Sequence, residues 1–169
     1  MSQDKIGNKI AAKFGNRLRT RVNGVLIQNE KILMINHQMG DHTDFWSVPG
    51  GGMKFGSNAN QNLMREFQEE TGLDIKVGEF LFVHEFLEPP LHAIELFFEV
   101  EPLGGEPHLG WDPELTESDQ ILRELKWMSL GELRSLPNAS VHQIFWGIKS
   151  FEDLGMWKGY FNFENKYLK

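Results

Sequence analysis

The most constraining feature of this sequence is the stretch of residues 45–73, FWSVPGGGMKFGSNANQNLMREFQEETGL. Its second half has helical periodicity and carries Glu66, Glu69 and Glu70. Side chains three and four positions apart on a helix are neighbours, so the three carboxylates share one face. Like charges at this spacing destabilise a helix by about 0.2–0.5 kcal/mol per pair. Because hard cations such as Mg²⁺ bind oxygen clusters of this kind, the pattern indicates a metal site; the alternative is a solvated helix face.

The same stretch predicts where its helix begins and ends. Asn58 with Gln61 three residues later resembles a capping box, and Ser57 is the other candidate for the N-cap. Gly72 follows the last turn, where a helix commonly ends with a glycine. The face expected to be buried consists of Ala59, Leu63 and Phe67, with Met64 beside it. Pro49 and the glycines at 50–52 are expected to form a loop that lets backbone approach a ligand, since they suit neither helix nor strand interior.

The bulk composition bounds the class of protein. A length of 169 residues suits one domain with a proper core. The absence of cysteine excludes disulfides, thiolate metal sites and cysteine nucleophiles. A net charge of −7 argues against nucleic acid as a partner. An acidic protein that binds polyphosphate needs local cationic side chains or a divalent metal. We find neither a signal peptide nor a membrane span, and we therefore expect a cytoplasmic protein with no membrane partner.

The remaining chain predicts a single mixed α/β domain. We expect an N-terminal leader over residues 1–17, with a short helix at 9–14, and the domain over 18–169. A hairpin over residues 19–38 should turn at Asn29 and Glu30. Further expected elements are a polar loop at 39–44, a short strand at 45–48, strands at 74–77, 79–87, 92–103 and 125–130, and helices at 131–136 and 141–154. Residues 159–169 are expected either to add a terminal strand or to lie across the surface. Residues 104–120 predict a long acidic loop of the kind that often binds ligands.

Gly51 and the run Arg65-Glu66-Phe67-Gln68-Glu69-Glu70-Thr71-Gly72-Leu73 resemble the box of the Nudix hydrolases, which are MutT-like enzymes. That pattern begins with a glycine, five residues, a glutamate and seven further residues. It then continues with Arg-Glu, an aliphatic or aromatic residue, any residue, Glu-Glu, any residue, glycine and an apolar residue. The spacing from Gly51 to Arg65 fits this pattern. One position departs, because the first glutamate of the box is Ser57 here. We expect weaker binding of one metal ion or a slower reaction as the result.

The resemblance implies a Nudix fold, a mixed β-sheet core flanked by helices as an α/β/α sandwich. It also implies Mg²⁺- or Mn²⁺-dependent hydrolysis at the pyrophosphate of a nucleoside diphosphate linked to another moiety. A nucleotide sugar, an ADP-ribose-like compound and a nucleoside triphosphate all remain open. By motif position the metal ligands are Glu66, Glu69, Glu70 and the backbone of Gly51. The general base is either Glu66 or a carboxylate of the acidic loop, for which the candidates are Asp112, Glu114, Glu117 and Asp119, with Glu114 preferred.

Other side chains are candidates for substrate contact. Arg65 either orients the carboxylates, contacts phosphate or forms a surface salt bridge. Arg19 and Arg21 are candidates to reach phosphate, with a solvated strand end as the alternative. Phe45 and Trp46 are candidates to stack on a base, with core packing as the alternative, and Gly50 and Gly51 offer backbone. The histidines on or beside strands, His37, His84 and His92, are interpreted as structural.

Two rival functions stay open. A catalytically weak Nudix-like module that senses a nucleotide metabolite is favoured by Ser57. An isoprenoid diphosphate isomerase is disfavoured, because that chemistry is expected to use a cysteine. The expected partner is a small nucleotide-type molecule, and a second copy of the chain is a further candidate partner.

Overall fold

The computed structural model describes residues 4–162 of the chain. Its strands are β1 (Arg17–Val25), β2 (Ile27–Gln28), β3 (Lys31–Gly40), β4 (Thr43–Ser47), β5 (Gly50–Gly52), β6 (Asp74–Glu88), β7 (Leu91–Gly104), β8 (Leu122–Ser129) and β9 (Tyr160–Phe161). Its helices are α1 (Lys5–Phe14), α2 (Ala59–Thr71), α3 (Leu130–Ser135) and α4 (Glu152–Met156), with short 3-10 helices η1 (Glu117–Asp119), η2 (Asn138–Ser140) and η3 (Gln143–Phe145). The predicted mixed α/β class is confirmed.

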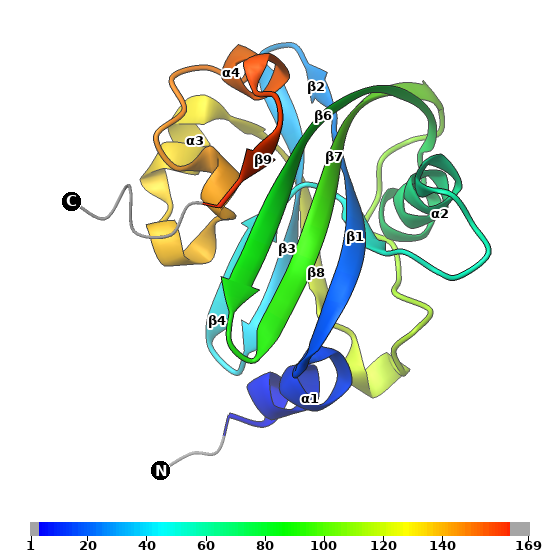
Figure 1. Cartoon of the computed structure of the whole chain (residues 1–169), viewed down its shortest axis with the longest axis vertical. Coiled ribbons are helices and arrows are strands. Elements are labelled where there is room, and N and C mark those ends of the chain that lie inside the picture. The colour runs from blue at the N-terminus through cyan, green and yellow to red at the C-terminus, as the bar shows by residue number, and fades with distance from the viewer. Residues whose placement is uncertain (1–3, 163–169) are drawn as a thin grey trace.

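The strands form two sheets. The first has the order β5-β1-β7-β6-β9. In the second, β3 is central and pairs with β4, with β8 and with the short strand β2. The first sheet is mixed, since β1 runs parallel to β7 while β6 and β7 are antiparallel. Helix α2 lies on one side of the sheets, and α3 and α4 lie on the other (Figure 1). The predicted arrangement of a mixed sheet flanked by helices is therefore confirmed.

Two apolar cores fill the space on the two sides of this arrangement. Residues 32–35 of β3 are all fully buried, because both faces of this strand are covered. Ile32 and Met34 face the core beneath α3 and α4, whereas Leu33 faces the core beneath α2. The hairpin that leads into β3 turns at Asn29 and Glu30, as predicted; both have positive φ, which suits a tight two-residue connection.

Helix α2 is positioned by its ends and its apolar face. Asn58 and Gln61 form the predicted capping box, and Gly72 ends the helix in left-handed backbone with φ 69°. Phe67 packs so closely on Gly24 of β1 that a Cβ there would overlap its ring. Leu63 is also fully buried, but Met64 is 47% exposed and lies outside the apolar stripe. The helix is therefore held against the first sheet, with its acidic face turned along that sheet's edge.

Three local predictions were wrong. The polar loop predicted at 39–44 is only a two-residue turn at 41–42, because β3 extends to Gly40 and β4 begins at Thr43. The glycines at 50–52 do not form a loop; they pair antiparallel with β1 as the edge strand β5, where the missing side chain of Gly51 lets the strand lie against Glu66. Residues 141–154 do not form one helix. Val141 instead bridges to Trp46, and Gly147 takes positive φ, so only a 3-10 turn and the short α4 remain.

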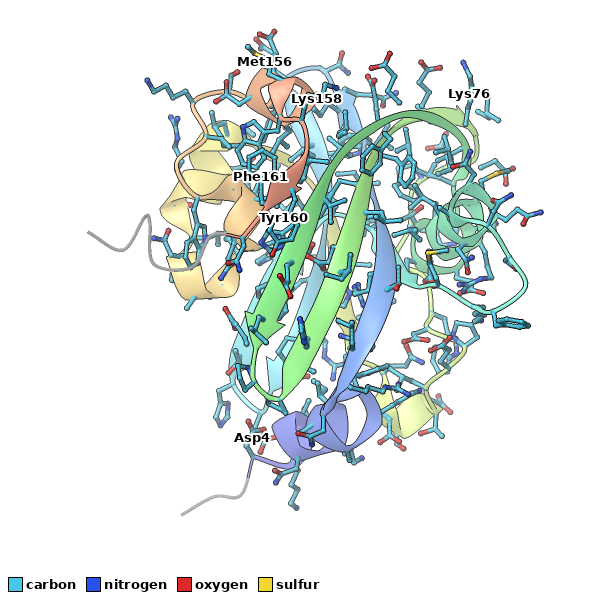
Figure 2. All side chains as sticks on the ribbon, viewed as in Figure 1. Asp4, Lys76, Met156, Lys158, Tyr160 and Phe161 are labelled. Atoms are coloured by element: carbon cyan, nitrogen blue, oxygen red, sulfur yellow. The ribbon has the colours of Figure 1, made fainter. Side chains whose placement is uncertain are left out.

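The helix and the strand nearest the two ends of the chain differ from the predicted ranges. Helix α1 begins at Lys5 and is longer than predicted, and it buries Ile10. Tyr160 and Phe161 form the predicted terminal strand, which pairs parallel with β6 (Figure 2); residues 163–169 of that prediction lie outside the described part. Between residues 4 and 162, no helix is both long and apolar enough to cross a bilayer.

Candidate active site

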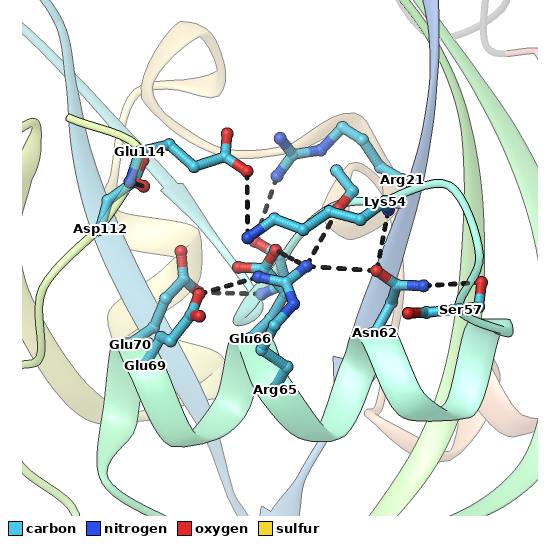
Figure 3. Close-up of polar contacts among 12 residues, drawn as sticks. Arg21, Lys54, Ser57, Asn62, Arg65, Glu66, Glu69, Glu70, Asp112 and Glu114 are labelled. Atoms are coloured by element: carbon cyan, nitrogen blue, oxygen red, sulfur yellow. Dashed lines mark hydrogen bonds and ion pairs between the residues drawn. The ribbon is translucent and has the colours of Figure 1, made fainter.

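A cleft of about 660 Å³ runs along β1 between the glycine strand β5, helix α2, helix α1 and the acidic loop. Nine of the predicted site residues line it, namely Arg19, Arg21, Phe45, Gly50, Gly51, Glu66, Glu69, Glu70 and Glu114. Figure 3 shows the helix carboxylates and Glu114 of the loop facing the same space as Arg21. Trp46 and Arg65 are predicted residues that do not line this cleft.

Arg65 connects the acidic residues of α2 rather than projecting into the cleft. Its guanidinium lies 2.8 Å from the carboxylates of both Glu66 and Glu69, and it also donates to the carbonyl of Gly52 at 3.3 Å. Two ion pairs from one guanidinium restrict the orientation of both carboxylates. These contacts are ion pairs with two helix carboxylates, and the orienting role of Arg65 stays a prediction.

The glycine strand approaches the helix through Glu66 and Glu70. The amide of Gly50 donates to the Glu70 carboxylate at 3.0 Å in a buried contact. The other Glu70 oxygen lies 3.8 Å from His37, which was interpreted from its sequence position as structural. At Gly51 an added Cβ would overlap the carboxylate of Glu66. Backbone and carboxylates therefore meet at a distance that only glycine permits.

Glu66 occupies an environment that disfavours its charge. Its side chain is buried, and burial together with the charge of Glu70 raises the pKa of Glu66 to about 7. Arg65 and Arg21 act in the opposite direction but do not compensate fully. Carboxylate oxygens with excess negative charge in a partly dry cleft form a donor set that suits a hard divalent cation.

The acidic loop is held by contacts in its middle and at its C-terminal end. The amides of Gly110 and Trp111 donate to the last carbonyls of α2, at 2.8 and 2.9 Å. Gln120 closes the loop on itself, since its side chain exchanges two hydrogen bonds with the backbone of Asp112. Glu114 lies 3.5 Å from the ammonium of Lys54 on the opposite wall. Of the four predicted loop carboxylates, Asp112 and Glu114 line the cleft and Glu117 and Asp119 do not.

The two predicted arginines lie side by side along β1. Arg21 donates to the carbonyl of Gly50 at 3.3 Å and lies 3.6 Å from the buried Glu95. Arg19 stacks on Phe14 of α1 with 5.0 Å between guanidinium and ring centre. Burial, with the charges of Arg21 and Arg17, lowers the pKa of Arg19 to about 10, and within residues 4–162 its Nε finds no hydrogen-bond partner. The guanidinium of Arg19 therefore stays cationic at neutral pH.

The neighbouring aromatic pair divides between cleft and core. Phe45 lines the cleft and packs edge-on against Phe86, with 6.1 Å between ring centres. Trp46 is buried in the core beneath α3 and α4. Alternation along a strand explains the difference, because successive side chains point to opposite faces. The structure therefore supports core packing, the alternative considered for Trp46.

Sequence patterns did not identify several other residues at the site. Asn62 is fully buried on α2, where it accepts from the Lys54 amide and donates to the carbonyls of Ser57 and Asn58. Ser57 itself is exposed at the opposite end of the helix from Glu69 and Glu70 (Figure 3). Phe14, Phe86, Glu95 and His142 also line the cleft. A signal for Glu95 existed, since it occupies an inward position of a strand that is otherwise apolar on that face.

Comparison with protein families gives a match to the NUDIX domain over residues 17–145. An ADP-ribose pyrophosphatase from Methanocaldococcus jannaschii is 32% identical over 98 residues, covering 57% of this chain and 58% of that protein. An 8-oxo-dGTP diphosphatase from Proteus vulgaris is 36% identical over 75 residues, covering 43% and 58%. The chain therefore spans little more than half the length of these two curated relatives.

Solved structures share the fold at lower identity. A UDP-X diphosphatase superimposes with a TM-score of 0.63 and 18% identity, over 91% of this chain and 73% of that one. A MutT NUDIX hydrolase from Burkholderia pseudomallei superimposes with a TM-score of 0.60 and 21% identity, over 73% and 93%. At these identities the likeness establishes the shared fold.

Proposed function

Because this chain belongs to the Nudix family, we propose that it hydrolyses the pyrophosphate bond of a nucleoside diphosphate linked to another moiety, with Mg²⁺ or Mn²⁺ as cofactor. The observation that carries the proposal is one cleft in which three helix carboxylates, the glycine strand and two arginines face each other. The two relatives named above support the reaction class, since one is a pyrophosphatase and the other a diphosphatase.

The residues at the helix fit a divalent metal. Glu66, Glu69 and Glu70 supply carboxylate oxygens, and the backbone of Gly51 lies against Glu66 without a side chain between them. A cation bound there would polarise the phosphoryl oxygens and lower the pKa of an attacking water. Compensation of the charge on Glu66 would favour its binding, because burial first and the charge of Glu70 second raise the pKa of this carboxylate.

The chain's own residues then perform the positioning and the proton transfer. Arg21 and Arg19 bind phosphoryl oxygens, since guanidinium groups form strong charge-assisted hydrogen bonds with phosphate. Phe45 stacks on the base or other planar moiety beyond the arginines. The general base is Glu66 or Glu114. Glu114 has the advantage of lying on the wall facing the helix, where Lys54 holds its carboxylate.

A panel of ADP-ribose, nucleotide sugars and nucleoside triphosphates, with Mg²⁺ or Mn²⁺, tests this proposal by release of phosphate or monophosphate. We expect metal-dependent turnover of at least one compound and its loss in Glu70→Gln. Turnover that Glu70→Gln leaves unchanged would exclude the metal role of the helix. Tight binding of one compound without turnover would favour the alternative supported by Ser57, a sensor of a nucleotide metabolite. A cytoplasmic location and a homodimer stay predictions from the sequence.

The Ser57 departure predicts a measurable metal requirement. Ser57→Glu adds a carboxylate to the cleft wall, and we expect the Mg²⁺ concentration for half-maximal rate to fall by about threefold or more, as a further oxygen ligand strengthens cation binding. Ser57→Ala is the matched control, because Asn58 rather than Ser57 caps the helix. An unchanged Mg²⁺ requirement in Ser57→Glu would show that another residue already compensates for the missing glutamate.

A further inference from the structure

A buried polar network at the floor of the cleft consists of residues without a proposed chemical role. The Glu95 carboxylate is 3.0 Å from Nδ1 of His84 and 2.7 Å from Nε2 of His142. All three side chains are buried. Burial alone would raise the pKa of Glu95, but His142, His84 and Arg21 face its carboxylate and hold that pKa well below its usual range. Glu95 is therefore a buried anion.

The hydrogen bonds at His142 decide between a metal site and a hydrogen-bonded network. His84, Glu95 and His142 have ligand atoms within 4.8 Å of one another, as a metal would need. However, the Ile144 amide donates to Nδ1 of His142 at 3.2 Å, so Nδ1 carries the lone pair and Nε2 the proton. Nε2 then donates to Glu95. A metal ion bound to Nε2 would have to displace this proton and its hydrogen bond to Glu95. The geometry therefore supports the hydrogen-bonded network.

The network extends in one row across three strands to the cleft. Glu95 pairs with Arg21 on β1 and with His84 on β6 in the strand register. Nε of Arg21 lies 3.6 Å from one Glu95 oxygen, and the histidines contact the other oxygen. Arg21 also donates to Gly50 of the glycine strand. One ion pair, to Glu95, and one hydrogen bond, to the Gly50 carbonyl, restrict the orientation of its guanidinium.

His142 connects this row to the aromatic part of the cleft. Its ring lies 6.0 Å from that of Phe45 and 5.9 Å from that of Phe86. The same residue is joined to β4, since its amide donates to the carbonyl of Trp46 at 2.9 Å. An ionised carboxylate is costly to bury unless it is fully paired. An apolar side chain like those of Ala93 and Phe97 on the same face would fill the position without that cost, but would leave Arg21 unanchored.

We propose that Glu95, held by His84 and His142, is a positioning residue that fixes the guanidinium of Arg21 for binding the pyrophosphate of the substrate. This inference rests on the proposed function, in which Arg21 contacts phosphoryl oxygens. Glu95 acts through Arg21 and does not itself touch the substrate. Because Arg21 binds phosphate in the ground state and in the transition state alike, loss of its orientation should raise KM more than it lowers kcat.

A double-mutant cycle of Glu95→Gln and Arg21→Gln tests this on the panel substrate with the highest turnover. Each single variant should raise KM about tenfold or more, with kcat within about threefold of wild type. In the Arg21→Gln background, Glu95→Gln should have no further effect on KM. Equal effects of Glu95→Gln in both backgrounds, or a loss confined to kcat, would overturn the proposal. Glu85→Gln is the control, because it removes a carboxylate that pairs with a histidine, His92, outside the cleft.

A second set of measurements does not need turnover. Imidazole ¹⁵N NMR of the wild type should show His142 as the neutral tautomer with hydrogen on Nε2. Calorimetry with Mg²⁺ and inorganic pyrophosphate should give about tenfold weaker binding for Glu95→Gln. His142→Gln, expected to weaken binding about threefold, replaces it if Glu95→Gln does not fold. If no panel compound is hydrolysed but these results hold, the proposed function fails and the positioning role stands. Absence of pyrophosphate binding by the wild type, or stoichiometric Zn²⁺ that is lost in His142→Gln, would overturn the positioning role.

Discussion

Replacing Glu66 with glutamine is expected to lower kcat/KM by about 10²–10⁴-fold and, at the same time, to stabilise the metal-free protein at pH 8. The loss of activity follows from Glu66 being both a proposed metal ligand and a candidate base. Glutamine keeps the size of the side chain and its hydrogen bonding to Arg65 but carries no charge. Steady-state kinetics at saturating Mg²⁺ measures this effect, with Glu99→Gln on the exposed side of β7 as the control.

The stability effect follows from the raised pKa of Glu66. Its value of about 7 in the folded protein lies above the ordinary value of 4.5, so the folded state binds more protons between these two pH values. Stability from this group therefore falls as pH rises from about 4.5 to 7, by about 3 kcal/mol at most. Glutamine has no such titration, so urea unfolding in EDTA should show a higher free energy of unfolding for Glu66→Gln at pH 8 but not at pH 4.5. A variant that is less stable than the wild type at both pH values would contradict the charge repulsion inferred at Glu66.

Gly51→Ala is expected to abolish most activity while leaving the fold intact. The new Cβ would overlap the carboxylate of Glu66, which is the flexible end of a side chain and can move away. The free energy of unfolding should therefore change by less than about 1 kcal/mol, since Gly51 lacks the positive φ that strains other residues. Displacement of a catalytic group by about 1 Å costs on the order of 10²-fold in rate. Mg²⁺ affinity should fall together with kcat.

Gly52→Ala provides the matched control for this prediction. A Cβ at Gly52 would meet no atom within 4 Å, although the residue follows Gly51 in the same strand. Its activity and Mg²⁺ requirement should match the wild type within about twofold, because the backbone carbonyl that Arg65 contacts is retained. Equal losses in Gly51→Ala and Gly52→Ala would mean that strand flexibility, rather than the contact with Glu66, is what the glycines provide.

Several features of the site could be predicted because they depend on residues close together in the chain. The carboxylate face of α2 follows from helical spacing alone, and its ends follow from the local hydrogen bonds of Asn58 and Gln61 and from the glycine at 72. Resemblance to a family over residues 51–73 then indicated which reaction such a face performs. The family match over residues 17–145 confirms the resemblance to the family, and the reaction at this face stays a proposal.

Features that depend on pairing between distant segments could not be predicted in the same way. Residues 141–154 have a helical pattern of apolar side chains, yet Ile144, Phe145, Ile148 and Phe151 are buried from turns rather than from one helix. The bridge of Val141 to Trp46 and the positive φ of Gly147 override the local pattern. Pairing with a distant segment, β1, likewise makes residues 50–52 a strand.

The sequence by itself determined the chemistry of the helix: three carboxylates on one face, Arg65 beside them and a glycine-rich segment before them. Those features are set by backbone periodicity and by side-chain type, which are local properties. Only the tertiary structure decided what surrounds that helix. It placed Trp46 in the core, brought Phe14 onto Arg19, and put Glu95 under Arg21. These contacts depend on strand register and on the packing of segments far apart in the chain, which no local pattern encodes.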